Sequence, residues 1–271
     1  MQTAPHKPLS SKDNSTILYL RSLSDPKHRK TEKAFLIEGV KMVAEALRDR
    51  AGVKMVVASP SLTQHHGKAV LELAENRSVD ILWISDRLMD AVSESKTPQP
   101  VMAVVEMKEH SEEGLLAHPS GLIVICHHLQ DPGNLGTIIR TAEAAGAAGV
   151  AVAHNTVDPY NAKTVRASMG SILRLPVVRI GDVSAFMEKC KRKEFQTVAM
   201  VLGSRRTHFE LDLKKPTAVI VGQEGSGLPD ELLKNIDHQV RIPMAETIDS
   251  LNVATSAAVF LYEAMRQRMK Q

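Results

Sequence analysis

Aromatic residues are scarce in this sequence, at 3% of its 271 residues. Aliphatic side chains must therefore fill the core, and an RNA-binding protein that stacks bases on aromatic platforms is disfavoured. Only two cysteines occur, Cys126 and Cys190, and neither belongs to a Cys-x-x-Cys pair or to a Cys/His group of zinc spacing. We therefore expect no metal site, and we expect a reducing, cytoplasmic compartment.

Long apolar runs are absent too. No stretch reaches the ~18 apolar residues of a membrane helix, and residues 1–14 lack the apolar core of a signal peptide. We expect no membrane partner and a disordered lead-in at 1–14. The sequence has no Gly-Lys-Ser/Thr loop and no Gly-x-Gly-x-x-Gly fingerprint, which disfavours P-loop nucleotide hydrolysis and a dinucleotide-dependent oxidoreductase. A formal charge of +3 and a pI near 8.8 are compatible with a nucleic-acid partner without establishing one.

Strand-like and helix-like segments alternate along the chain, which predicts an α/β protein with parallel strands. The strands expected in the first half are 34–38, 53–58, 80–84 and 101–105. The helices expected there are 15–23, 39–50, 67–74 and 86–92. Residues 108–120 are charged and run into Pro-Ser-Gly, so we interpret them as a linker between a domain at 15–107 and a domain at 121–271.

The second half restarts with "GLIVICHHL", a nearly continuous apolar run that is typical of a buried parallel strand. The further strands expected are 150–153, 175–178, 197–202, 218–221 and 239–242. The helices expected between and after them are 135–145, 159–170, 183–193, 229–236 and 251–270.

Two segments of this half carry polar residues or glycines where a strand gives way to a helix. In "DPGNLGTIIRTAEAAGAAGV", Asn134 stands where a helix N-cap belongs, and Arg140 follows two turns into the helix. In "AVIVGQEGSGLPDEL", the strand breaks at Gly222 into a glycine loop, which lets a ligand approach the backbone at the carboxyl end of the strand. Taken singly, a capped helix and a tight turn explain these segments as readily.

A third segment, "RIPMAETIDSLNVATSAAVFLYEAMRQRMK", runs from a strand through a polar turn into the last helix. Ser250 can cap that helix, and the small residues at 254–258 permit close approach of another element. Because small residues cover most of its circumference, we expect the helix to be buried on more than one side. A well-packed terminal helix is the alternative.

In this order and spacing, "NLGTIIRTAEAAG", "IVGQEGSGL" and "IPMAETIDSLNVATSAAVFLYEA" resemble the three signature motifs of the TrmH (SpoU) family of RNA ribose 2'-O-methyltransferases, in the SPOUT superfamily. The resemblance covers about 120–271. The stretch "RSLSDPKHRKTEKAFLIEGVKMVAEAL" is similar to the smaller N-terminal α/β RNA-binding domain of many members. The resemblance implies a catalytic domain with a parallel-sheet α/β knot, a deep trefoil in which the C-terminal segment threads through a loop, and a homodimer.

The methyl donor that the resemblance implies is S-adenosylmethionine. The positions that match the family's donor contacts are Gly222, Ile242, Leu251, Leu202, Gly203, Met244 and Val253. Among them, the apolar side chains of Ile242 and Leu251 would sandwich the flat adenine ring.

Five positions match the family's polar catalytic residues, and Arg140 matches its arginine. A guanidinium stays protonated in proteins, so we expect Arg140 to bind the adjoining phosphate and stabilise charge on the 2'-oxygen rather than act as a base. Asn134 and Glu224 would orient Arg140, while Ser250 and Asn252 would hold the target nucleotide or the turn.

We expect Arg166, Arg29, Lys30 and Arg174 to neutralise RNA phosphates. A solvated charged face is the alternative for these side chains. The resemblance implies a structured RNA substrate. Because the family's transfer-RNA enzymes often lack the N-terminal domain, the two-domain layout favours ribosomal RNA, and we expect 23S ribosomal RNA. The alternatives are a transfer-RNA ribose methyltransferase, a ribosomal-RNA methyltransferase that confers antibiotic resistance, and a non-catalytic RNA-binding ribosome-assembly factor on the same fold.

Overall fold

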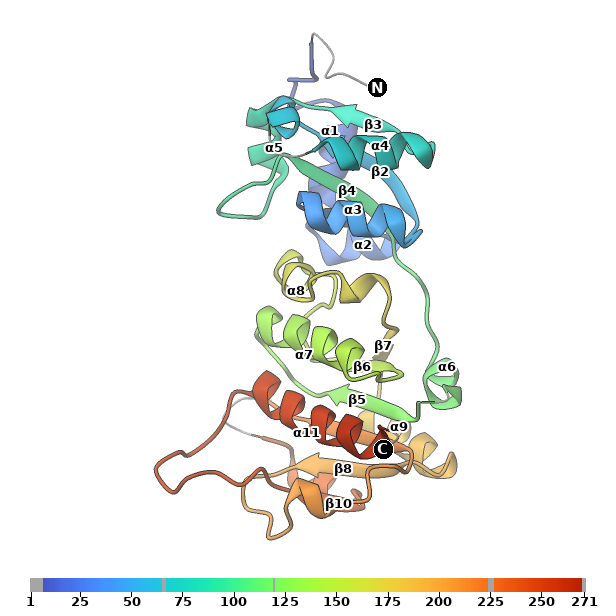
Figure 1. The fold of residues 1–271 in the computed structure, drawn as a ribbon, viewed down its shortest axis with the longest axis vertical. Coiled ribbons are helices and arrows are strands. Elements are labelled where there is room, and N and C mark those ends of the chain that lie inside the picture. Colours follow the sequence, from blue (N-terminus) through green and yellow to red (C-terminus); the bar gives the residue numbers. More distant parts are fainter. Residues whose placement is uncertain (1–6, 65–66, 119, 224–226, 270–271) are drawn as a thin grey trace. The chain divides into compact units, whose positions relative to one another are not determined.

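The computed structural model describes residues 7–64, 67–118, 120–223 and 227–269. The chain forms two compact units (Figure 1). The first comprises Met1–Lys108 with Tyr160–Arg166, and the second comprises Glu109–Pro159 with Ala167–Gln271. No helix in the described ranges is long and apolar enough to cross a membrane.

The first unit is built on a four-stranded sheet with the order β1-β4-β2-β3. Its strands are β1 (Ala34–Glu38), β2 (Val53–Ala58), β3 (Ile81–Trp83) and β4 (Val101–Glu106). The parallel pairing that the alternating pattern predicts holds only for β2 with β3, since β4 runs antiparallel to both β1 and β2. The helical segments are α1 (Ser15–Ser22), α2 (Pro26–Glu32), α3 (Val40–Arg48), η1 (Pro60–Gln64), α4 (Lys68–Asn76), α5 (Asp86–Val92) and α8 (Ala162–Ala167).

The described part of the expected disordered lead-in is ordered. Leu9 pairs with Ile84 beside β3: its amide donates to the Trp83 carbonyl at 3.0 Å, and its carbonyl accepts from the Ser85 amide at 2.8 Å. The Leu9 side chain also packs against the core of this unit. The prediction of a disordered lead-in is therefore wrong for this part of 1–14.

The second unit is built on six parallel strands with the order β10-β8-β9-β5-β6-β7. The strands are β5 (Leu122–Cys126), β6 (Gly149–Ala153), β7 (Val177–Ile180), β8 (Gln196–Met200), β9 (Thr217–Val221) and β10 (His238–Val240). The helical segments are α6 (Glu112–Ala117), α7 (Pro132–Ala144), η2 (Ser171–Leu173), α9 (Val183–Arg192), η3 (His208–Glu210), α10 (Asp230–Leu233) and α11 (Val253–Arg268). The predicted α/β class with a parallel sheet and a smaller N-terminal domain is confirmed.

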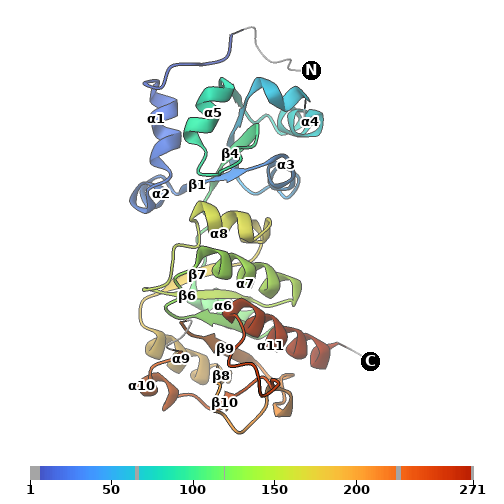
Figure 2. The ribbon, with the colours of Figure 1, turned by 90° about the vertical axis from the view of Figure 1, so that its left-hand side faces the viewer.

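Helices cover both faces of the parallel sheet (Figure 2). On one face, α6, α9 and α10 contribute apolar side chains to a core with Ile123 and Ile125 of β5. On the other face, α11 lies alongside α7, and the small residues Ala254, Ala257 and Ala264 of α11 are buried. The opposite side of α11 is exposed at Thr255, Val259, Tyr262 and Arg266, so the expectation that this helix is buried on more than one side is wrong within this chain.

The segment interpreted as a linker, 108–120, contains α6. Ser111 caps this helix by accepting from the Gly114 amide at 3.0 Å. Leu115 and Leu116 are buried in the core of the second unit. The segment is therefore in large part an element of the second unit rather than a free connection.

Candidate active site

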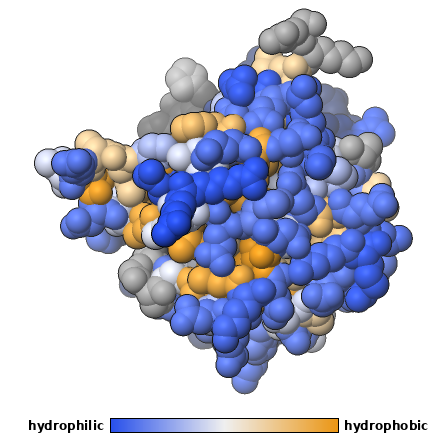
Figure 3. Space-filling model, turned by 90° about the horizontal axis from the view of Figure 1, so that it is seen from below, coloured by the Kyte–Doolittle hydropathy of each residue, from blue (hydrophilic) through white to orange (hydrophobic). Residues whose placement is uncertain are grey.

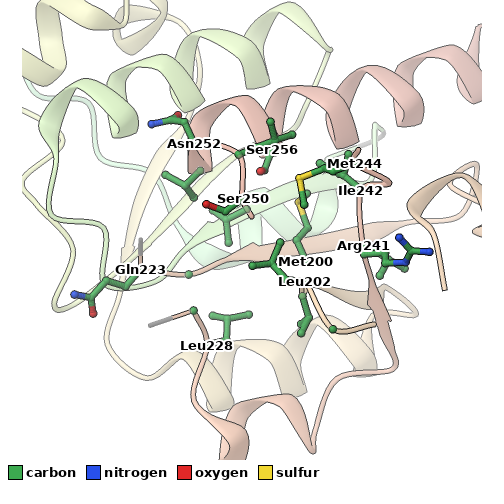
Figure 4. Close-up of a pocket in the computed structure, with 18 of the residues that line it drawn as sticks. Met200, Leu202, Gln223, Leu228, Arg241, Ile242, Met244, Ser250, Asn252 and Ser256 are labelled. Carbon is green, nitrogen blue, oxygen red and sulfur yellow. The ribbon is translucent and has the colours of Figure 1, made fainter. Parts of the chain in front are cut away.

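A pocket of about 600 Å³ lies in the second unit where β8, β9 and β10 end (Figure 4). The carboxyl ends of parallel strands are where open α/β sheets bind ligands. Three stretches of chain line the pocket, one after each of these strands. The lining residues include Met200, Val201, Leu202, Gly203, Val221, Gly222, Gln223, Gly227, Leu228, Val240, Arg241, Ile242, Met244, Asp249, Ser250, Leu251, Asn252, Val253 and Ser256.

All seven positions predicted to contact a cofactor line this one pocket. Ile242 and Leu251 are half-buried, so each keeps an apolar surface that a flat ring can cover. Leu202 is 61% exposed and stands free at the rim. The structure thus brings the predicted positions together, and their role as ligand contacts stays a prediction.

At position 222 the backbone passes so close to the chain at Gly227 that there is no room for a side chain. A Cβ atom at this position would lie 2.5 Å from the Gly227 carbonyl oxygen and 2.8 Å from its carbon. The chain returns close to itself here, because the Gly227 amide donates to the Gln223 carbonyl at 3.0 Å. Gly222 therefore keeps a narrow turn at the pocket wall. Glu224, predicted to orient Arg140, lies outside the described residues.

The stretch after β10 is held in place by the chain that follows β8. The Arg241 amide donates to the Arg206 carbonyl at 2.9 Å, and the His208 amide donates to the Arg241 carbonyl at 3.0 Å. Thr207 and Arg241 form a parallel bridge. Ile242 and Met244, which line the pocket, therefore follow a short extension of the sheet. The Arg241 side chain points away from the pocket (Figure 4).

The N-caps of two helices are not the residues that the sequence predicts. Asp131 caps α7 by accepting from the amides of Gly133 at 2.6 Å and Asn134 at 3.0 Å. Asn252 caps α11 by accepting from the amides of Ala254 at 2.9 Å and Thr255 at 3.3 Å. The predictions that Asn134 and Ser250 act as caps are therefore wrong.

Asn134 instead joins the first motif to the third. The Asn252 Nδ2 donates to the Asn134 Oδ1 at 3.0 Å, across 118 positions of sequence. Asn252 thus uses its oxygen for the helix and its nitrogen for the neighbouring motif. This bond fixes the start of α7 against the turn that carries Ser250 and Leu251.

Arg140 lies on the exposed side of α7. Within the described ranges its guanidinium has no hydrogen-bond or ion-pair partner. A guanidinium carries five N–H donors, which is the chemistry that an anion requires. Asn134 lies six residues earlier, so the two side chains leave the helix about 120° apart. The predicted orientation of Arg140 by Asn134 and Glu224 stays a prediction.

Two histidines follow β5 at the same edge of the sheet. The rings of His127 and His128 lie 4.2 Å apart. Burial, and then the charge of His128, lowers the pKa of His127, so this imidazole is neutral at pH 7. The His128 Nε2 lies 3.1 Å from the Asn155 Nδ2.

The four cations predicted to bind RNA differ in what they are free to do. Arg29 is 3% exposed and donates to the Leu23 and Ser24 carbonyls at 2.7 Å, so it is a buried structural residue and its predicted RNA contact is wrong. Arg174 forms a bidentate salt bridge with Glu143, in which its Nε donates to Oε1 at 2.6 Å and its Nη2 donates to Oε2 at 3.1 Å. Lys30 is exposed and Arg166 is half-buried, and for both the RNA contact stays a prediction.

Sequence reasoning missed several pocket residues, among them Met200, Leu228 and Ser256. Met200 ends β8, and Leu228 follows the glycine loop that follows β9. The signal was available, since the ends of consecutive parallel strands converge at one edge of a sheet. Ser256 lies one turn into α11, where a hydroxyl in a run of small residues gave no signal of its own.

The fold and the pocket define a class: an α/β protein with a ligand site at the carboxyl ends of a parallel sheet, joined to a smaller α/β unit. Residues 121–262 match the SpoU rRNA methylase family, and residues 14–103 match the MRM3-like substrate binding domain. The chain therefore belongs to the SpoU rRNA methylase family.

Relatives and a solved structure support the same assignment. The chain is 32% identical to the 23S rRNA (guanosine(2553)-2'-O)-methyltransferase RlmP of Bacillus subtilis, over 94% of this chain and 98% of the relative. It is 33% identical to the 23S rRNA (uridine(2479)-2'-O)-methyltransferase of Streptomyces viridochromogenes, over 87% of this chain and 83% of the relative. It is similar to the AdoMet-bound rRNA methyltransferase of Sinorhizobium meliloti, with a TM-score of 0.80, 33% identity and coverage of 97% and 99% of the two chains. The predicted family, enzyme class and methyl donor are thereby confirmed.

Proposed function

We propose that this chain transfers a methyl group from S-adenosylmethionine to a ribose 2'-hydroxyl of 23S ribosomal RNA. The observation that carries the proposal is that the three motif segments converge at the carboxyl ends of the strands. Two of the segments line the pocket, and the first is bonded to the third through Asn134 and Asn252. The two enzymes named above act on a guanosine and on a uridine, and both act on the 2'-oxygen of 23S rRNA. The shared element is the ribose, so we assign the ribose rather than a base as the acceptor.

The pocket residues fit the donor. Its volume of about 600 Å³ suits a ligand of nucleoside size. Ile242 and Leu251 supply apolar surface for the adenine, and Gly222 keeps the turn beside them free of a side chain. When bound, S-adenosylmethionine supplies a methyl group on a positively charged sulfur, which is already a strong electrophile.

The protein's own task is to place and activate the hydroxyl. Arg140 is exposed at the first motif, and its guanidinium fork matches two phosphate oxygens. We assign it to the phosphate next to the target ribose, where it also stabilises negative charge on the 2'-oxygen. Asn252 holds the turn against α7 through its bond to Asn134. We assign Ser250, which lines the pocket, to the target nucleotide or the turn.

We also propose that the C-terminal segment forms a deep trefoil knot. Two facts support this. β10 lies at the edge of the sheet, yet α11 packs on α7, which follows β5 three strands further in. The chain after Val240 must therefore cross the ends of β8 and β9, where the stretches at 200–203, 221–223 and 227–228 border the same pocket.

Finally, we propose a homodimer in the cytoplasm. Hydrophobic side chains interrupt the hydrophilic surface of the molecule (Figure 3). Val259 and Tyr262 of α11 are 37% and 52% exposed, and Phe209 of η3, which α11 contacts, is 55% exposed. Three large apolar side chains on adjoining elements are the kind of surface that a second subunit covers. We assign the cytoplasm because the proposed substrate is ribosomal RNA.

The test is methyl transfer with purified protein, labelled donor and 23S rRNA transcribed in vitro, followed by mass-spectrometric mapping of 2'-O-methyl sites. We expect one modified ribose, with Arg140→Lys abolishing product while donor binding by calorimetry persists, because lysine keeps the charge without the fork. Methylation of transfer RNA instead would reassign the substrate. Donor-independent RNA binding without any product would support an assembly factor.

A further inference from the structure

We propose that three arginines at the open edge of the second unit's sheet form a second contact for the RNA backbone, beside the donor pocket. We call Arg205, Arg206 and Arg241 the edge cluster. The inference rests on the proposed function, because it takes the RNA substrate as given. It adds a place where a phosphodiester chain is held, separate from Arg140 on α7.

The backbone of the cluster is held by hydrogen bonds, because the chain after β8 runs along the end of β10, which is the edge strand of the sheet. The Ser204 Oγ donates to the Gln239 carbonyl at 2.7 Å and accepts from the Arg206 amide at 3.2 Å. The Arg241 amide donates to the Arg206 carbonyl at 2.9 Å. These bonds hold consecutive arginines of one loop next to an arginine of the edge strand's extension.

The side chains within the cluster are differently engaged. Arg206 donates from Nη2 to the Glu210 carbonyl at 3.0 Å, and its Nη1 lies 3.4 Å from the His238 Nδ1, yet the residue remains exposed. Arg205 is exposed and Arg241 half-buried, and within the described ranges neither guanidinium has a bonded partner. In the described chain, two of the three guanidinium groups therefore make no hydrogen bond, and the third, that of Arg206, is fixed in orientation.

The local charge is positive even when the nearest carboxylates are counted. Glu210 faces Arg206 and Arg241, but it is held by the Thr207 amide at 2.5 Å and the Thr207 hydroxyl at 2.6 Å. Asp237 is bonded to Thr197 and paired with a lysine of α9. Burial, followed by the charge of Arg206, lowers the pKa of His238, and the charge of Asp237 opposes this shift.

The position of the cluster favours RNA over a small anion. Arg241 also lines the donor pocket, while its side chain points away from it (Figure 4). Because Arg241 belongs both to the cluster and to the pocket lining, a polyanion that is bound along the cluster passes beside the pocket. Planar guanidinium groups bind phosphate oxygens in pairs, and a row of them fits a phosphodiester chain better than an isolated ion.

The main variant is Arg205→Gln/Arg206→Gln, and the matched control is Arg192→Gln/Lys193→Gln. The control also removes two neighbouring exposed cations of the second unit, at the end of α9. Both proteins are compared with wild type for binding to 23S rRNA transcribed in vitro over a salt series. Each lost phosphate contact lowers the slope of log K against log salt by about 0.7 to 0.9. We expect the main variant to lose about 1.5 in slope and about tenfold in affinity near physiological salt, and the control to match wild type.

Donor calorimetry and chain mass by light scattering accompany each titration. Unchanged donor affinity and oligomeric state with a reduced salt slope would support the cluster as an RNA contact. The main variant also removes the hydrogen bonds of Arg206, which could unfold the loop. An Arg205→Glu variant avoids this problem, since the Arg205 side chain has no bonded partner in the described chain. It should weaken binding at least as much.

A main variant with the wild-type slope and affinity would overturn the inference, as would an equal loss in the control. A main variant that only dissociates a dimer would also overturn it, because the cluster would then serve a protein partner. If wild type itself yields no 2'-O-methyl product, the proposed function fails, whereas an active wild type with an unaffected variant removes the edge cluster alone.

Discussion

Asn252 offers the sharpest test of how the site is assembled, because one side chain does two separable things. Its oxygen caps α11 through the amides of Ala254 and Thr255. Its nitrogen donates to Asn134 at 3.0 Å. A serine at this position can cap the helix but is too short to reach Asn134, and an alanine can do neither.

The magnitudes follow from the two roles. Loss of an N-cap costs about 1 kcal/mol, and loss of one hydrogen bond between side chains costs about 1 kcal/mol. We therefore expect Asn252→Ala to lower the free energy of unfolding by about 2 kcal/mol and Asn252→Ser to lower it by about 1 kcal/mol.

The assay is urea unfolding of wild type, Asn252→Ser, Asn134→Ala, Asn252→Ala and the Asn134→Ala/Asn252→Ala double variant. Asn134 has interactions beyond the one with Asn252, so its single variant mixes several effects. The cycle cancels them and leaves the coupling between the two side chains, which we expect to be about 1 kcal/mol. Donor calorimetry on Asn252→Ser should show weaker binding, because the turn that carries Leu251 is no longer tied to α7.

Two results would refute this reasoning. Equal destabilisation by serine and alanine would mean that the cap contributes nothing. A coupling near zero would mean that the bond between the two asparagines does not hold the motifs together, and the site would then need another explanation for its rigidity.

Gly222→Ala should lower donor affinity at least tenfold by calorimetry, because its Cβ would meet the Gly227 carbonyl oxygen at 2.5 Å and move the pocket wall; unchanged affinity would mean that the loop yields without cost. Glu263 has its pKa lowered from 4.5 to about 2, first by the hydrogen bond from Arg266. Its contribution to stability is therefore complete above pH 4.5 and is lost as the pH falls to about 2, so unfolding curves of wild type and Glu263→Gln should differ at pH 6 and converge near pH 2. Arg268→Gln removes a half-buried guanidinium that donates to backbone carbonyls before β5 and β9, and it should lower the urea midpoint by an amount equivalent to about 2 to 3 kcal/mol; no shift would show that α11 is held by its apolar face alone.

The sequence located most of the strands and helices, because apolar periodicity and strand length depend on local residues. Its errors are informative where local signals compete. Asp25-Pro26 and Asp131-Pro132 each begin a helix, with the aspartate as N-cap and the proline in the first turn. The same dipeptide is a sufficient signal for both, yet the predicted helices omit α2 and begin α7 at residue 135, three residues late, with Asn134 as the expected cap.

Burial of charge was the second source of error. Arg29 lies within a basic stretch that predicts a solvated or RNA-binding surface, and the structure instead uses it to bond the carbonyls at the end of α1. In the same way, the charged stretch at 108–120 hides two adjacent leucines that reach the core. Composition averaged over a segment cannot show which single side chain turns inward.

The site posed a different problem, since its parts are distant in sequence. Periodicity gives no order of strands, so nothing local places β8 between β9 and β10 or brings α11 back over α7. The glycine at 222 and the small residues of α11 are each explained by ordinary packing when considered alone. They acquire a common cause only when the chain after β10 has to cross the ends of its neighbours, because a crossing requires close approach of backbones, and close approach requires residues without bulky side chains.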